Sequence, residues 1–182
     1  TMVPLYVVKD NQTLKDREEI TPSEIFRHVD NGGALCTTAA VNIEDYTQIF
    51  SEFSKEFDAV IHINIGADFS CSHQNALIAA QEFDNVYIVD SKNLCGGQGC
   101  LVLRAAQMAE DGMDPQEICG NIEKLREKVE ASFIIDRLDY MRKGGRCSLI
   151  AEFGANIMRL KICIEVKDGK LQVAKKYRGS FE

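Results

Sequence analysis

The 182-residue sequence lacks an apolar run that approaches the length of a membrane-spanning helix, and no signal-peptide pattern begins it. It also has few clustered positive charges: apart from Arg142-Lys143 with Arg146, no group of Lys and Arg is longer than two residues. The formal net charge is −7 and the pI is about 5.1. We therefore expect no stable membrane insertion and no nucleic-acid binding through phosphate neutralisation.

The cysteine pattern argues against two further classes of protein. The seven cysteines are an odd number, and they are scattered through predicted strands and helices rather than framing loops. This favours reduced thiols in a cytoplasm over a disulfide scaffold. A zinc site could be imagined from His73, Cys71 and the distant Cys95 and Cys100. Their spacing matches neither C-x-x-C nor H-x-x-x-H, so we expect no metal and no cofactor.

The chain does contain a regular alternation of apolar strand patterns and helix patterns. Strands are expected at 3–8, 59–65 and 86–89, and helices at 21–29, from 42, at 72–83, at 98–110 and from 114. This alternation predicts an α/β fold, with a parallel, doubly wound sheet and helices on both faces. Thr21-Pro-Ser-Glu24 is typical of a helix start, because a hydroxyl N-cap precedes Pro and Glu.

The pattern changes after residue 132. We expect a short strand at 133–135, a helical turn at 138–141 and a helical stretch at 149–156. Asp168-Gly169, between strand patterns at 160–167 and 170–176, predicts a tight hairpin. We therefore expect an α/β domain at residues 1–154 and the beginning of an antiparallel α+β domain at 155–182.

Two neighbouring segments pass from a strand into a turn that carries hydroxyl groups. The first holds Thr37 and Thr38, and the second holds Ser70 and Ser72 just before a helix. Hydroxyls and free helix N–H groups at the carboxyl end of a strand form an anion site, so two such turns on one sheet suggest a carboxylate or phosphate ligand. The alternative is that one serine caps the helix and the threonines are ordinary strand residues. Both readings stay open from spacing alone.

Other polar segments are less specific. Cys95-Gly-Gly-Gln-Gly-Cys100 matches neither dinucleotide nor P-loop fingerprints, which favours a tight turn with close backbone approach. Asp90-Ser91 lies at a strand end as a polar pair next to the site. Lys143-Gly-Gly-Arg146 carries two cations that suit a ligand anion or a partner protein, although a solvated turn fits equally well. His62, in mid-strand, is expected in the core.

The same residues offer no catalytic constellation. Cys71 and His73 are two positions apart at a helix start and point in different directions. Asp136 and Asp139 have no recognisable carboxylate partner for acid–base chemistry. We therefore assign no catalytic residue.

Several segments, in their order along the chain, resemble the DegV family of bacterial proteins, and the similarity continues to Gly179. Among them, Lys143-Gly-Gly-Arg-Cys-Ser148 is the most specific. The matching segments are Thr38-Ala-Ala-Val-Asn-Ile-Glu-Asp-Tyr46, Phe69-Ser-Cys-Ser-His-Gln-Asn-Ala76, Asp90-Ser91 with Gly97-Gln-Gly99, and Leu138-Asp-Tyr-Met-Arg-Lys-Gly-Gly-Arg-Cys-Ser148.

The resemblance implies a function. Members of the family act as fatty-acid-binding proteins, including the FakB subunits of bacterial fatty acid kinase. It implies a lipid tunnel between an α/β domain and a second α+β domain, with the carboxylate held by a threonine and a serine hydroxyl. By motif position these are Thr38 and Ser70, and Arg146 matches a family arginine near the site. Thr37, Ser72 and Lys143 are further candidates for supporting the ligand or contacting a partner.

Three departures from the family pattern are visible. The usual Thr-Ser-Gln-Pro-Ser is here Thr38-Ala-Ala-Val-Asn42, and the usual Leu-Ser-Gly-Thr-Tyr-Gln is here Phe69-Ser-Cys-Ser-His-Gln74. The first strand of the family, and its C-terminal region with a histidine near the carboxylate, are not found in the sequence. We therefore expect that the sequence is a fragment or a trimmed form of a longer protein.

The resulting expectation is a cytoplasmic bacterial protein that binds one long-chain fatty acid in an apolar tunnel. It would present the carboxylate to a separate ATP-dependent fatty acid kinase, which makes the acyl phosphate, and would itself catalyse nothing. The alternative from the enzyme class is a phosphotransferase or hydrolase using the Ser70 turn, with His73 or Asp90 as base. A third reading is an interaction module that uses the loop from Arg142 to Arg146.

Overall fold

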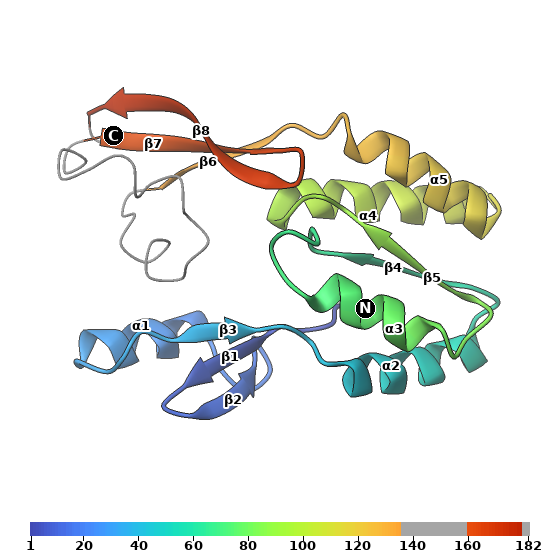
Figure 1. Cartoon of the computed structure of the whole chain (residues 1–182), viewed down its shortest axis with the longest axis horizontal. Coiled ribbons are helices and arrows are strands. Elements are labelled where there is room, and N and C mark those ends of the chain that lie inside the picture. Colours follow the sequence, from blue (N-terminus) through green and yellow to red (C-terminus); the bar gives the residue numbers. More distant parts are fainter. Residues whose placement is uncertain (136–159, 180–182) are drawn as a thin grey trace.

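The computed structural model describes residues 1–135 and 160–179 of the chain. Strands and helices alternate along most of the chain, and Figure 1 shows how they are arranged. They are β1 (Tyr6–Lys9), β2 (Gln12–Lys15), α1 (Pro22–Asp30), β3 (Thr37–Ala39), α2 (Ile43–Glu56), β4 (Val60–Asn64), α3 (Ser72–Ala80), β5 (Val86–Asp90), α4 (Cys95–Glu110), α5 (Pro115–Arg126), β6 (Ala131–Ile135), β7 (Leu160–Lys167) and β8 (Lys170–Arg178).

The centre of the fold is a parallel strand pair covered by helices. β4 and β5 pair in parallel, from Val60 opposite Val86 to Asn64 opposite Asp90, and α3 connects them. Helices α4 and α5 lie on one side of this pair, and α2 and α3 lie on the other (Figure 1). The expected α/β class, with a parallel sheet and helices on both faces, is confirmed, although among the described strands only β4 and β5 pair in parallel.

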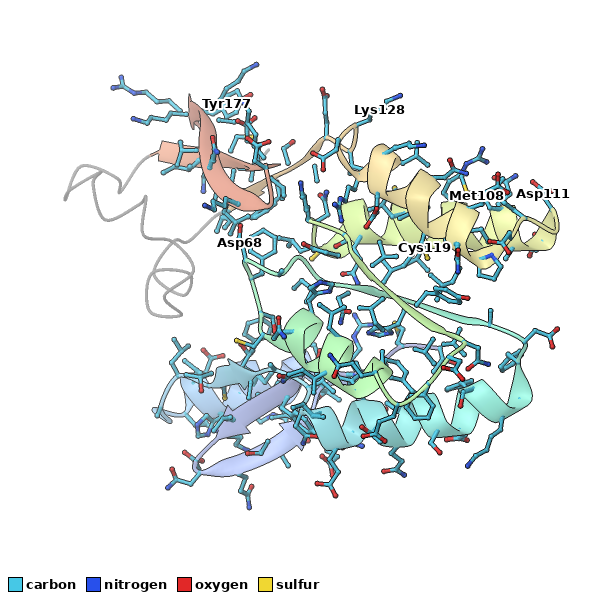
Figure 2. All side chains as sticks on the ribbon, turned by 45° about the vertical axis from the view of Figure 1, so that its right-hand side comes forward. Asp68, Met108, Asp111, Cys119, Lys128 and Tyr177 are labelled. Carbon is cyan, nitrogen blue, oxygen red and sulfur yellow. The ribbon has the colours of Figure 1, made fainter. Side chains whose placement is uncertain are left out.

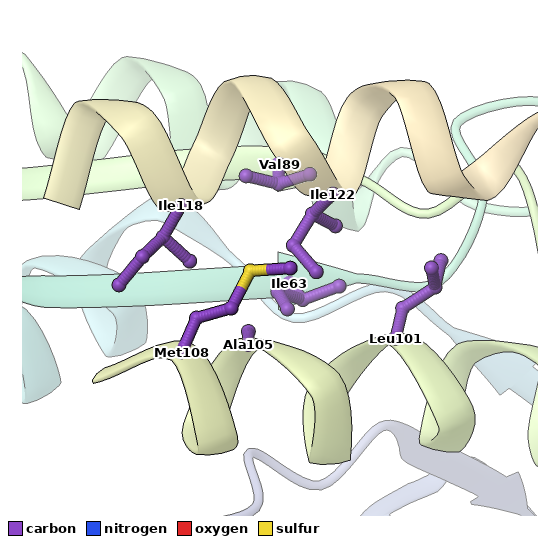
Figure 3. Packing of buried hydrophobic residues seen from close by; sticks show 7 residues of the cluster. All are labelled: Ile63, Val89, Leu101, Ala105, Met108, Ile118 and Ile122. Atoms are coloured by element: carbon purple, nitrogen blue, oxygen red, sulfur yellow. The ribbon is translucent and has the colours of Figure 1, made fainter. Parts of the chain in front are cut away.

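Alternate residues of β4 and β5 belong to two different hydrophobic clusters, because successive side chains of a strand point to opposite faces. Ile63 and Val89 face α4 and α5, where they join the cluster drawn in Figure 3. The opposite face packs on Tyr46, Phe50 and Ala76 of α2 and α3. That second face also receives His62 and Asn64, which alternate with Ile63.

The first strands form a separate antiparallel sheet in the order β2-β1-β3. Asp10 and Asn11 both have positive φ, 46° and 67°, as a two-residue type I′ hairpin turn requires. β2 is an addition to the strands expected from the sequence. Since β3 pairs with β1 and not with β4, the expectation that both hydroxyl-bearing turns leave one sheet is wrong.

The last described strands form a third sheet in the order β6-β7-β8. Asp168 and Gly169 both have positive φ, 53° and 75°, which confirms the predicted hairpin. Ile162 and Ile164 pack there with apolar side chains of all three strands. The proposed boundary between residues 154 and 155, the helical turn at 138–141 and the helix at 149–156 lie outside the described residues.

Helix α1 begins with the capping box expected from its sequence. Thr21 Oγ1 accepts the backbone N–H of Glu24 at 3.4 Å, and Glu24 Oε2 accepts the backbone N–H of Thr21 at 2.8 Å. The Thr21 hydroxyl, which donates to Glu24 Oε2 at 2.7 Å, and then the Thr21 backbone N–H lower the pKa of the Glu24 carboxyl below its ordinary value. The local sequence alone therefore determines where this helix begins.

Thr21→Ala is expected to lower the melting temperature by roughly 2–4 °C, because one first-turn N–H group loses its acceptor. The exposed Ser23→Ala, one residue inside the helix, is the matched control and should change it by less than 1 °C, roughly the error of the measurement. Thermal unfolding followed by circular dichroism measures both. Equal melting temperatures for the two variants would contradict a stabilising role for the cap.

Candidate functional site

The serine turn lies where β4 ends and α3 begins. Ser72, the first residue of α3, is 1% exposed, and Ser70 is half-buried. The two hydroxyl oxygens are 2.8 Å apart, and Ser70 Oγ also accepts the backbone N–H of Ser72 at 3.2 Å. Ser70 therefore caps one N–H group of the first turn of α3. The N-cap residue Cys71 makes no side-chain cap bond.

The threonine turn is tied to this helix through Val41. Ser72 Oγ accepts the Val41 N–H at 3.3 Å, and Asn75 Nδ2 donates to the Val41 carbonyl at 2.7 Å. Thr38 is three residues earlier on β3, so its Cα lies within roughly 11 Å of the Val41 Cα even in a fully extended chain. Contacts with α3, and not strand pairing, bring the two turns together.

Thr37 and Thr38 themselves are exposed on β3, opposite Val8 and Val7 of β1. No hydrogen bond between Thr38 and Ser70 is found within the described part of the chain. The structure thus places Ser70 at the start of α3, and Ser72 links this turn to Val41 in the segment that follows Thr38.

A buried polar group formed by Asn64, His62 and Tyr46 lies under the serine turn. This group was not predicted from the sequence. The side chain of Asn64, at the end of β4, is 3% exposed and its Nδ2 donates to the Tyr46 hydroxyl at 3.0 Å. Asn64 Nδ2 also lies 3.1 Å from His62 Nε2. The signal for this group was present: two polar residues spaced by two on an apolar strand share one face of the sheet.

This polar group is uncharged at neutral pH. Burial, with a smaller contribution from His73, lowers the pKa of His62 to about 4. Burial also raises the pKa of Tyr46, and hydrogen bonds from Asn64 and Ser72 partly offset that rise. The Tyr46 hydroxyl therefore lies between Asn64, to which it is hydrogen-bonded, and the Ser72–Ser70 pair. The His62 ring packs edge-on against Tyr46 and Phe50, as expected of a core residue.

Two buried polar atoms of this region have no hydrogen-bond partner among residues 1–135 and 160–179. They are Asn64 Oδ1 and His73 Nδ1. An unpaired buried polar atom costs roughly 1–3 kcal/mol, and most such atoms in folded proteins are paired. Both are therefore candidates for contact with a bound molecule.

The loops that follow β4 and β5 support the serine turn. Asp90 Oδ1 accepts the N–H groups of Ala67 at 3.1 Å and of Lys92 at 2.8 Å. The turn of the β7–β8 hairpin lies against both loops: a Cβ atom placed at Gly169 would lie 3.5 Å from Asp68 Oδ2 and 3.7 Å from Lys92. Figure 2 shows Asp68 beside this hairpin. Asp90 is thus a supporting residue, as its place at the strand end indicated.

The glycine-rich segment forms the first turn of α4, with Gly97 buried against its surroundings. A Cβ atom at Gly97 would lie 2.3 Å from Asn93 Oδ1 and 3.2 Å from the Ala131 Cβ. Asn93 is 3% exposed, so its side chain has little room to move. This close approach is the role expected from the sequence.

Gly97→Ala is therefore expected to lower the free energy of unfolding by about 1–3 kcal/mol through overpacking. Gly99→Ala, two residues later in the same helix, is the control, because a Cβ atom there meets nothing within 4 Å. It should leave stability unchanged or raise it slightly, since Ala favours helix. Urea denaturation compares the two, and a Gly97→Ala protein as stable as wild type would contradict the steric argument.

A small cavity of about 100 Å³ lies between the N-terminal sheet and α2, next to Val41. Its polar edge includes Tyr6, Asp45 and Lys15. The Tyr6 hydroxyl donates to the Asp45 carboxylate, and this bond raises the pKa of Tyr6 to about 12. The volume is well below the roughly 300–1,000 Å³ of small-molecule sites, so this cavity by itself does not hold a long acyl chain.

Arg146 and Lys143 lie outside the described residues. Within the described ranges, no group of three His, Cys, Asp or Glu side chains is arranged to hold a metal, and no helix is long and apolar enough to cross a membrane. The Ser70 hydroxyl is bonded to Ser72 and to a backbone N–H, and in the described part of the chain it has no His or Asp partner.

The fold and the site define an α/β protein with a hydroxyl-lined candidate anion site at the end of a parallel strand. The chain belongs to the DegV family: the family model described as "Uncharacterised protein, DegV family" matches residues 1–181. This confirms the resemblance seen in the sequence. A DegV domain-containing protein of Caldanaerobacter subterraneus is 32% identical over 98% of this chain.

Solved structures of relatives have the same fold. A DegV family protein from Thermus thermophilus, described as fatty acid binding, is 34% identical with a TM-score of 0.87 over 97% of this chain. A stearic-acid-binding protein from Eubacterium ventriosum is 27% identical with a TM-score of 0.88 over 98% of this chain. The chain spans 64% of the length of each of these three relatives.

Proposed function

We propose that this protein binds one long-chain fatty acid and holds its carboxylate with the hydroxyls of Thr38 and Ser70. The observation that carries the proposal is the hydrogen-bonded link from Ser70 through Ser72 to Val41, which joins the serine turn to the threonine strand. The first N–H groups of α3 have no acceptor within the helix, and of these the Ser72 N–H already donates to Ser70 Oγ.

The chemistry of the region supports a carboxylate ligand. A buried carboxylate must be hydrogen-bonded, and hydroxyl and N–H groups can donate those bonds and carry no negative charge themselves. His62 is neutral at pH 7 and Tyr46 keeps its proton, so neither repels an anion. The acyl chain would gain about 0.8 kcal/mol for each CH₂ group buried in an apolar tunnel. The fatty acids named for the Thermus and Eubacterium relatives support the same ligand class.

The partner is part of the same proposal. By resemblance to the family, the protein would lie in the cytoplasm, present the acyl carboxylate to a separate ATP-dependent fatty acid kinase and catalyse no step itself. Arg146 and Lys143 are the proposed residues for supporting the site or contacting the kinase. The division into an α/β domain and a second α+β domain, with the tunnel between them, also belongs to this proposal.

Native mass spectrometry of the protein purified from bacteria tests the ligand directly. We expect a bound species heavier than the polypeptide by the mass of one long-chain fatty acid, released on denaturation and identified by lipid mass spectrometry. Delipidated protein should take up one equivalent of added oleic or stearic acid. A protein that carries no acyl chain and takes up none on addition would contradict the proposal.

A further inference from the structure

We propose that Asn64 is a further ligand-contacting residue, whose side-chain amide donates a hydrogen bond to the carboxylate of the bound acid. The inference deepens the proposed function and rests on it. It adds a donor from the strand side of the site, where sequence reasoning and family resemblance assign none.

The first observation is the unpaired end of a deeply buried amide. Asn64 is 3% exposed, its Nδ2 lies 3.0 Å from the Tyr46 hydroxyl and 3.1 Å from His62 Nε2, and its Oδ1 has no partner in the described part of the chain. One end of the amide is thus fully engaged, and the other end is buried and unpaired.

The oxygen and the nitrogen of the Asn64 amide can exchange places. Turning the amide by 180° exchanges Nδ2 and Oδ1. Tyr46 O–H and a His62 Nε2–H tautomer would then both donate to Oδ1, because both groups can act as donors. His62 can carry a single ring proton in this way, since its pKa of about 4 leaves it neutral. In this orientation Nδ2, with two hydrogens, is the unpaired end and suits an acceptor such as a carboxylate oxygen.

The third step places Asn64 beside the proposed carboxylate site. Asn64 hydrogen-bonds the Tyr46 hydroxyl, Ser72 lies close enough to Tyr46 to lower the pKa of that hydroxyl, and Ser72 hydrogen-bonds Ser70. The hydroxyls of Tyr46 and Ser72 therefore lie between Asn64 and Ser70, with His62 on the other side of Asn64. A carboxylate has two oxygens and about four acceptor positions, so Thr38 and Ser70 leave positions for another donor.

The geometry also explains why this strand carries polar residues on a face that packs on α2 and α3. Three side chains hold the amide in position: Tyr46 and His62 by direct contact, and Phe50 by packing on His62. A donor held by its neighbours loses little conformational freedom when a ligand arrives. Tyr46 and His62 are thus positioning residues for Asn64.

Two near-isosteric variants test the inference: Asn64→Leu, which removes both polar ends, and Asn64→Asp, which replaces the donor with an acceptor. Binding of stearic acid and of stearyl alcohol is measured for each protein after delipidation. We expect Asn64→Leu to weaken stearic acid binding by roughly 10- to 100-fold, the effect of one hydrogen bond to a charged group. The alcohol has no carboxylate, so its affinity should change by less than about threefold. Asn64→Asp should weaken the acid more than Asn64→Leu does, through charge repulsion.

The matched control is Asn121→Leu on α5, across the sheet from the site, which removes a half-buried amide whose Nδ2 contacts Met113 Sδ. It should leave both affinities unchanged. Equal losses for acid and alcohol in Asn64→Leu would show a structural role and overturn the inference, as would an Asn64→Asp protein that binds the acid as tightly as wild type. If wild type binds the acid and Asn64→Leu matches it, this inference alone fails. If wild type binds no acyl ligand, the proposed function fails with it.

Discussion

The double variant Thr38→Val, Ser70→Ala is expected to lose at least 100-fold in affinity for a long-chain fatty acid. Each hydroxyl would donate one hydrogen bond to a charged carboxylate, and each such bond contributes roughly 1.5–3 kcal/mol. Removing both leaves the carboxylate buried with fewer donors, which costs more than a loss at an exposed site. Isothermal titration calorimetry with delipidated protein measures the change.

The fold should survive this change. Thr38 is exposed on β3, and Ser70→Ala removes one acceptor at the start of α3, a loss of about 1 kcal/mol in stability. The matched control is Thr13→Val, Ser23→Ala, which makes the same two chemical changes at exposed positions of β2 and α1. That control should bind like wild type. Retained affinity in the double variant would remove Thr38 and Ser70 from the site.

The second large effect concerns pH. We expect the free energy of unfolding to fall as pH is lowered from about 6.5 toward 4, by about 2 kcal/mol at pH 5 and about 3 kcal/mol in total. The cause is His62, whose pKa in the folded protein is about 4 because its ring is buried against Tyr46 and Phe50 and lies near His73.

The direction follows from proton uptake. An unfolded chain protonates this histidine as pH falls through its ordinary value near 6.5, whereas the folded protein does not until about pH 4. Within that range the unfolded state binds more protons, so stability is present above pH 6.5 and is lost on acidification.

Urea denaturation at pH 8, 6.5 and 5 tests this, with His62→Gln as the variant that removes the titrating ring and keeps a hydrogen-bonding group beside Asn64. Its stability should depend much less on pH between 8 and 5. His28→Gln, in α1 and outside this polar group, is the control and should keep the wild-type dependence. An unchanged slope in His62→Gln would assign the effect to other groups.

Features set by neighbouring residues could be predicted from the sequence. The Thr21–Glu24 capping box, the Asp168-Gly169 hairpin and the alternation of strands and helices depend on residues a few positions apart, and the structure has all of them. The β1–β2 hairpin was missed because Asp10-Asn11 is a less distinctive turn than Asp-Gly. The order and spacing of the matching segments along the chain were likewise sufficient to predict the family.

The candidate site depended on contacts between distant residues. Ser70 and Thr38 were identified from their turns, but that Ser72 contacts Val41, 31 positions away, follows only from how α3 packs on the segment between β3 and α2. The sequence by itself thus determined the elements, the family and the hydroxyl groups. The tertiary structure decided that the two turns belong to different sheets, that Tyr46, His62 and Asn64 form a buried polar group, and that one end of Asn64 is unpaired. The physical reason is that local conformation depends on neighbours along the chain, whereas burial and hydrogen bonding between elements depend on which faces meet when they pack.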